Sequence, residues 1–71
     1  GMTDGTQAAI RAALRSAREK HPRWPGGFEA VSIVVEEVGE MAQAVNEHEA
    51  QRAREEALDA IVTLVRFIEG E

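Results

Sequence analysis

Two clusters of acidic residues in the second half of the chain carry the side chains most suited to chemistry. The first is the run EEVGE at residues 36–40, and the second is the run EALD at residues 56–59. Acids three or four residues apart lie on the same side of a helix, where like charges repel by roughly a few tenths of a kcal/mol per pair. Such repetition indicates that something compensates for the repulsion.

The spacing between the two clusters predicts that they face each other. Position 48 is the midpoint between Glu37 and Asp59, and also the midpoint between Glu40 and Glu56. An antiparallel helix hairpin that turns there brings the four carboxylates together about two helical turns from its tip. Packed helices lie about 8–10 Å apart, a gap that facing carboxylates and a hard divalent cation can fill. The spacing therefore predicts a site for Mg²⁺, with Mn²⁺ as the alternative ion.

Apolar residues on the same helix faces favour partial burial of these acids. On a helical wheel Glu40 falls between Ile33 and Ala44, while Glu56 and Asp59 share their side with Ala60, Thr63 and Phe67. The alternative is that the acids simply serve as helix formers on solvated faces. Because 30% of the chain is charged, spacing alone leaves that alternative open.

Three helices are expected to position the acids, and a marked break follows the first of them. Asp4 followed by Gln7 fits a capping box, which predicts a helix from there to about Lys20. Two prolines and two adjacent glycines then predict a loop over residues 21–27, because prolines restrict the residues before them and glycines interrupt helices.

The other two helices form the predicted hairpin. Apolar residues at helical spacing predict one helix over residues 28–46 and another over residues 50–68. Neither proline nor glycine separates them, and we place the turn at residues 47–49. The expected fold is an all-α, three-helix chain in a single domain over residues 1–71, with Gly1 interpreted as a remnant of an expression tag.

The stock of large apolar residues predicts self-association. Apolar residues make up 44% of the chain, but 12 of these 31 are Ala and only 19 are larger. Chains this short bury about 60% of their unfolded surface, and this one has no Cys to form a disulfide. The helix over residues 50–68 is apolar around much of its circumference, which favours burial on more than one side. We expect a homodimer or tetramer with a four-helix-bundle-type core.

The distribution of charge argues against several classes of partner. The net charge is −5, with +3 in residues 1–27 and −8 in residues 28–71. An acidic half disfavours nucleic-acid binding, which needs a basic face for the phosphates. No apolar run approaches the ~20 residues of a membrane span, and no signal-peptide pattern is present. With no Cys either, the expected compartment is the cytoplasm.

The acidic runs have the order and spacing of a known motif. EEVGE, a gap of fifteen residues and EALD together resemble the EExxE…ExxD signature of the MazG-like all-α NTP pyrophosphohydrolases. That group also includes dimeric dUTPases and phosphoribosyl-ATP pyrophosphohydrolase. The resemblance covers roughly residues 24–68. It implies Mg²⁺-dependent hydrolysis of a nucleoside triphosphate between the α and β phosphates, which yields the monophosphate and pyrophosphate.

The resemblance also implies a role for each acid. Glu37 and Glu40 would bind Mg²⁺, and Glu56 and Asp59 would complete the shell from the next helix. Glu36 would be a further ligand or would orient water, so that Glu36 and Glu37 are the candidate catalytic residues. Members of the group are usually longer, with a later helix that supplies cations for the phosphates. Here those cations are expected from the N-terminal half of the chain or from another subunit.

The predicted loop offers candidates for substrate binding. Lys20 and Arg23 would contact phosphates, and Trp24 would stack on a nucleobase. The alternative for Trp24 is a hydrophobic plug over the small bundle, and we favour it because the chain has few large core residues. A competing interpretation of the whole chain is a non-catalytic helical oligomeric module, or an inactive MazG-like relative whose acids bind metal only structurally.

Overall fold

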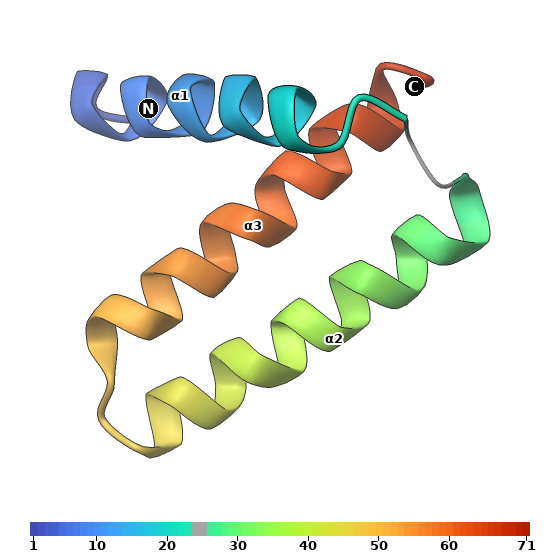
Figure 1. Cartoon of the computed structure of the whole chain (residues 1–71). Helices are drawn as coiled ribbons and strands as arrows, with labels where there is room; N and C mark the ends of the chain where they lie inside the picture. The colour runs from blue at the N-terminus through green and yellow to red at the C-terminus, as the bar shows by residue number, and fades with distance from the viewer. Residues whose placement is uncertain (24–25) are drawn as a thin grey trace.

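The computed structural model of the chain describes residues 1–23 and 26–71. These residues form three helices, α1 (Asp4–Lys20), α2 (Gly27–Asn46) and α3 (Ala50–Ile68) (Figure 1). The described part of the chain contains no strand and no helix that is long and apolar enough to cross a membrane. The all-α prediction is confirmed, and the predicted helix bounds hold to within one residue.

The cap of α1 differs from the prediction. Thr3, and not Asp4, is the N-cap residue, because its side-chain oxygen accepts a hydrogen bond of 3.1 Å from the backbone N–H of Thr6. Asp4 is the first residue of the helix, where a carboxylate still interacts favourably with the unpaired N–H groups of the first turn. The predicted capping box of Asp4 and Gln7 is therefore wrong, because the helix begins one residue earlier, with Thr3 as its N-cap.

A Schellman turn reverses the chain between α2 and α3. His48 adopts a left-handed conformation with φ of 59°, and its N–H donates to the carbonyl of Val45 at 3.1 Å. The N–H of Glu49 donates to the carbonyl of Ala44 at 2.8 Å, which completes the two bonds of this motif. The predicted position of the turn is confirmed, and a histidine occupies the place that glycine usually takes.

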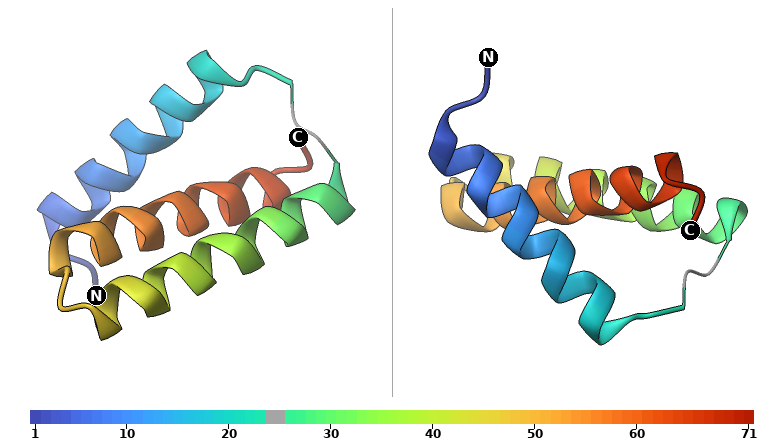
Figure 2. Two further views of the ribbon diagram at one scale, coloured as in Figure 1. Left: turned by 60° about the horizontal axis from the view of Figure 1, so that its bottom comes forward. Right: turned by 90° about the horizontal axis from the view of Figure 1, so that it is seen from above.

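The hairpin of α2 and α3 forms the body of the molecule, and α1 lies across it. In the described residues α1 packs on α3 and not on α2, and α3 lies between them in the left view of Figure 2. The buried apolar side chains are few and mostly small, namely Ala30, Ala44, Ala60 and Val62. Small side chains let the helices approach closely, but they bury little apolar surface.

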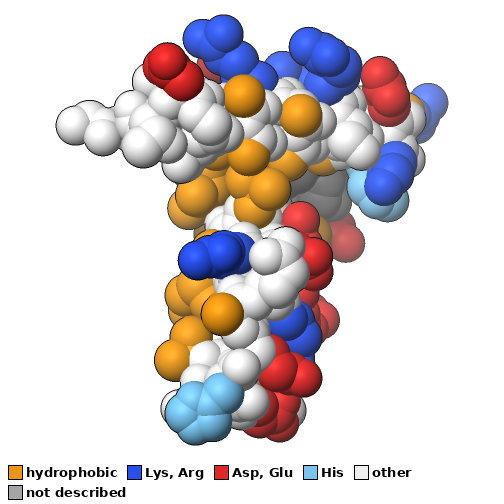
Figure 3. All heavy atoms as spheres, turned by 90° about the vertical axis from the view of Figure 1, so that its left-hand side faces the viewer, with side chains coloured by type: hydrophobic (Ala, Val, Ile, Leu, Met, Phe, Trp, Pro, Cys, Tyr) orange, Lys and Arg blue, Asp and Glu red, His pale blue; other side chains and the backbone are white. Residues whose placement is uncertain are grey.

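The hairpin exposes apolar residues along one edge and acids along the opposite edge (Figure 3). Phe28 is 97% exposed and Ile68 is 79% exposed. Further exposed apolar side chains lie on both helices of the hairpin: Val31, Val35, Val38, Val45, Ile61, Leu64 and Phe67. We call these nine residues the apolar edge. A single chain therefore leaves much of its apolar stock in contact with water.

Candidate active site

Glu40 on α2 and Glu56 on α3 form the acid pair nearer the hairpin tip. A hydrogen bond with Glu40 is the main reason that the pKa of Glu56 rises to about 7, and partial burial and neighbouring negative charges raise it further. Two carboxyl groups can share a hydrogen bond only when one of them carries a proton. The two acids thus face each other across the hairpin, and Glu56 keeps its proton at pH values well above the ordinary pKa of a glutamate, 4.5.

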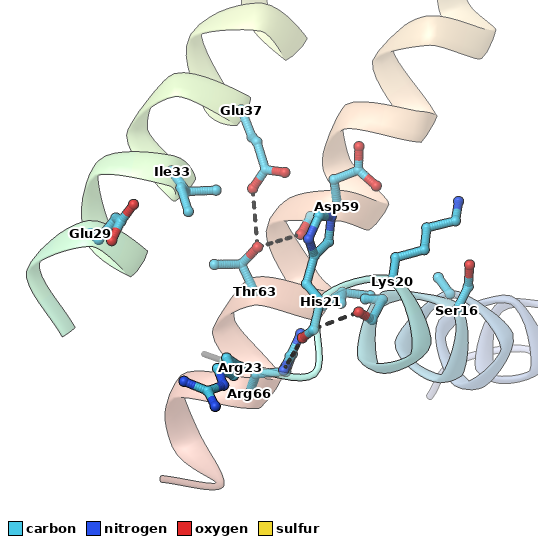
Figure 4. Close-up of a pocket in the computed structure, with 13 residues that line it drawn as sticks. Ser16, Lys20, His21, Arg23, Glu29, Ile33, Glu37, Asp59, Thr63 and Arg66 are labelled. Atoms are coloured by element: carbon cyan, nitrogen blue, oxygen red, sulfur yellow. Dashed lines mark hydrogen bonds between the residues drawn. The ribbon is translucent and has the colours of Figure 1, made fainter. Parts of the chain in front are cut away.

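Glu37 and Asp59 form the second pair, one helical turn further from the tip. The Thr63 hydroxyl lies 3.3 Å from Oε1 of Glu37 and 2.9 Å from the backbone carbonyl of Asp59, and it can donate to one of them at a time. Burial raises the pKa of Glu37, and the charge of Asp59 raises it further. The hydrogen bond from Thr63 lowers the same pKa, but by less. Figure 4 shows Glu37 and Thr63 pointing toward each other from α2 and α3.

The pKa of Asp59 reflects a wider circle of charges. Burial raises it first, and then the charges of Glu55 and Glu40 raise it, whereas the ammonium of Lys20 lowers it. Glu37, Glu56 and Asp59 therefore lie close enough to other acids for neighbouring negative charge to raise their pKa values. Burial and this negative charge both disfavour the ionised form of each acid.

A divalent cation fits the chemistry of these donors, because oxygen ligands with uncompensated negative charge suit a hard ion such as Mg²⁺. As the side chains stand, no group of three or more acidic or histidine side chains among the described residues is placed to hold a metal ion. The two pairs sit one turn apart along the hairpin. Joining them in one coordination shell would require rotation of side chains, which glutamates can undergo without movement of the backbone.

A pocket of about 600 Å³ opens beside the Glu37–Asp59 pair (Figure 4). The acids come from α2 and α3, whereas Lys20 and Arg23 reach the pocket from the end of α1 and the segment after it. Ala13, Ala17, Ile33 and Val62 supply an apolar part of the lining. The pocket thus combines acids, cations and apolar surface in one cavity.

The predicted site residues fall into three groups. Glu37, Asp59, Lys20 and Arg23 line the pocket, so one chain supplies both the acids and the cations. Glu40 and Glu56 face each other next to it but do not line it. Glu36 is exposed on α2 and contributes only a small charge effect to the pKa of Glu37. Trp24 lies outside the described residues.

Sequence reasoning did not single out Thr63 or Arg66, which both line the pocket. Thr63 is buried four residues after Asp59, on the same face of α3. Arg66 is buried although it is charged, with an exposed fraction of 2%. An isolated arginine in the apolar stretch Leu64–Ile68 is the signal that could have drawn attention to it, because arginine is rarely buried without partners.

Comparisons with known proteins identify no relative of this chain. No family model, no curated protein and no solved structure matches the chain. The likeness to the MazG-like group therefore rests on the acidic motif and its spacing alone.

Proposed function

We propose that the protein is a Mg²⁺-dependent nucleoside triphosphate pyrophosphohydrolase that forms the monophosphate and pyrophosphate. The observation that carries the proposal is the pocket in which Glu37 and Asp59 stand beside Lys20 and Arg23. Its volume of about 600 Å³ lies within the roughly 300–1,000 Å³ that is usual for small-molecule sites.

In this proposal the cations of the pocket and the acids in and beside it have separate tasks. Lys20 and Arg23 hold phosphate oxygens, while Glu37, Glu40, Glu56 and Asp59 hold the metal. The bound cation would neutralise charge on the phosphate oxygens as the bond to the leaving pyrophosphate breaks. Glu37 would accept the proton of the attacking water through a carboxylate oxygen that is not engaged with the metal. Glu36 would help to orient that water.

We propose further that a second copy covers the apolar edge and forms a four-helix core. A shallow groove of about 150 Å³ lies on this edge, lined by the apolar residues Ala30, Val31, Val34, Val35, Leu64 and Phe67 together with Thr63. Exposed apolar area of this kind usually marks an interaction surface. A two-fold dimer is the commonest assembly in which a second copy of a chain covers such a surface. A tetramer would be a pair of such dimers. The proposed compartment is the cytoplasm, in keeping with a chain that has no Cys.

A second candidate function is a non-catalytic helical module. The observation in its favour is that the four acids, as they stand, are not placed as a metal-holding group within the described residues. In that case the acids are partly solvated or bind metal only structurally, and the apolar edge is the functional surface.

Thermal melting with and without ligands distinguishes the two functions. A ligand that binds only the folded protein raises its melting temperature. We expect Mg²⁺ with a non-hydrolysable triphosphate to raise it above the value with Mg²⁺ alone, and buffer without divalent cations, with NaCl at equal ionic strength, serves as the control. Structural metal binding also gives a rise with Mg²⁺ or Mn²⁺ alone, so a melting temperature that no triphosphate changes further would favour the non-catalytic module.

A further inference from the structure

We infer that Arg66 is a positioning residue, which fixes the end of α1 on α3 and thereby sets where Lys20 stands at the pocket. The part of this inference that concerns phosphate binding rests on the proposed function. The part that concerns the position of α1 stands on the geometry of the chain alone.

The bonds of Arg66 reach two separate segments. One terminal nitrogen donates to the carbonyl of His21 at 2.8 Å and the other to the carbonyl of Ala17 at 3.4 Å, while Nε donates to Glu71 at 2.8 Å. The rigid fork of a guanidinium can serve these three acceptors at once, whereas the single ammonium of a lysine is not shaped for it. The side chain therefore joins the last turn of α1 to the end of α3.

A turn at the end of α3 completes this connection. Gly70 has a φ of 73°, and the N–H groups of Gly70 and Glu71 donate to the carbonyls of Phe67 and Arg66 at 3.1 and 3.2 Å. This Schellman turn folds the chain back, and glycine takes the left-handed conformation with little strain. Its effect is to bring the Glu71 carboxylate to Arg66 and also to Arg18 on α1.

The position of α1 depends on these polar contacts because its apolar contact with α3 is small and only half-buried. None of its residues is buried, and in the described part of the chain it packs on α3 alone. Lys20 lies between Ala17 and His21, the two residues whose carbonyls Arg66 holds. If α1 swung about its far end, Lys20 would leave the pocket and the neighbourhood of Asp59.

Distance measurements between two spin labels test the positioning directly. The chain has no Cys, so Glu19→Cys at the pocket end of α1 and Gln51→Cys on α3, both exposed, can be labelled selectively. Labelled protein is diluted into excess unlabelled protein so that only distances within one chain are measured. We expect a narrow distribution in the parent and in the control Arg54→Met, which removes an exposed arginine from the same helix.

Arg66→Met should broaden or shift this distribution while circular dichroism still shows the three helices. Arg66→Lys keeps the charge but loses the fork, and it should give an intermediate distribution. If Arg66→Met fails to fold, the lysine variant decides. A distribution in the folded variant that matches the parent overturns the inference.

A binding measurement connects the position of α1 to the site. With Mg²⁺ and an α,β-methylene triphosphate, Lys20→Met should weaken binding about tenfold in the parent, the effect of losing one charged hydrogen bond. In the Arg66→Met background the same change should have little effect, because Lys20 no longer stands at the pocket. Equal weakening in both backgrounds contradicts the inference. No weakening in either contradicts the proposed function instead, and the distance measurement then decides the position of α1 by itself.

Discussion

At the scale of single residues, the acids carry the candidate site, and the pairing of Glu40 with Glu56 was predictable. The midpoint at residue 48 placed Glu40 opposite Glu56, and the shared hydrogen bond that raises the pKa of Glu56 is the consequence. Thr63 and Arg66 were not predictable in the same way. Their importance arises from contacts with Glu37, Ala17 and His21, which lie far away in the sequence.

The raised pKa of Glu56 predicts how stability depends on pH. The folded protein holds a proton up to a pH of about 7, whereas the ordinary value is 4.5. Between these values the folded chain binds more protons than the unfolded chain, so the free energy of unfolding falls as the pH rises. We expect the metal-free protein to melt at a lower temperature at pH 7.5 than at pH 5.

Glu56→Gln should reduce this pH dependence, because the amide carries no charge to repel Glu40. Glu19→Gln, at an exposed position on α1, is the matched control and should keep it. Melting curves over the two pH values measure the effect. A parent protein that becomes more stable as the pH rises through this window would contradict the electrostatics of the acid pair.

At the scale of elements, periodicity and chain breakers predicted the helices well. The bounds of α3 agree because its apolar spacing runs without interruption from Ala50 to Ile68. The cap of α1 was missed because Thr3 and Asp4 are adjacent residues that both favour the N-cap. No glycine marks the turn at His48 in the sequence. Its position was predicted from the shared midpoint of the two acid pairs, Glu37 with Asp59 and Glu40 with Glu56.

The left-handed conformation of His48 makes a prediction about stability. A side chain there costs about 1 kcal/mol relative to glycine, since its Cβ approaches the backbone closely. His48→Gly should therefore stabilise the protein by about 0.5 kcal/mol, because the entropy cost of glycine in the unfolded chain cancels part of the gain. His48→Ala keeps the Cβ and should change little. Chemical denaturation measures both, and a glycine variant less stable than the alanine variant would contradict the conformation of the turn.

At the scale of the whole molecule, composition predicted a small core, and the structure has one. Only four apolar side chains are buried among the described residues, and three of these are alanines. The other large apolar side chains that the structure describes are half-buried or exposed, and most of the exposed ones form the apolar edge. Self-association itself stays a prediction, because packing between copies depends on shape and not on composition. The angle of α1 was equally beyond sequence reasoning, since the bonds of Arg66 fix it.

The apolar edge makes a prediction about assembly. Leu64 is 46% exposed in one chain, so Leu64→Glu should disturb the fold of a single chain little but place a charge inside the proposed interface. We expect light scattering at micromolar concentration to give a mass of at least two chains for the parent and a lower mass for Leu64→Glu. Gln51→Glu, at an exposed position near the hairpin tip, should behave as the parent does. A parent mass of 7.8 kDa, that of one chain, would exclude the dimer.

The hydrolysis of nucleoside triphosphates by Asp59→Asn tests the central claim most directly. The amide keeps the shape of the side chain but removes the charge that would hold the metal, and the chain's other aspartate provides the control Asp4→Asn. With Mg²⁺, phosphorus NMR should detect monophosphate and pyrophosphate from the parent and from Asp4→Asn, but no turnover by Asp59→Asn while its helices remain formed. Turnover by Asp59→Asn at the parental rate, or no turnover of any triphosphate by the parent, would contradict the assignment of the site.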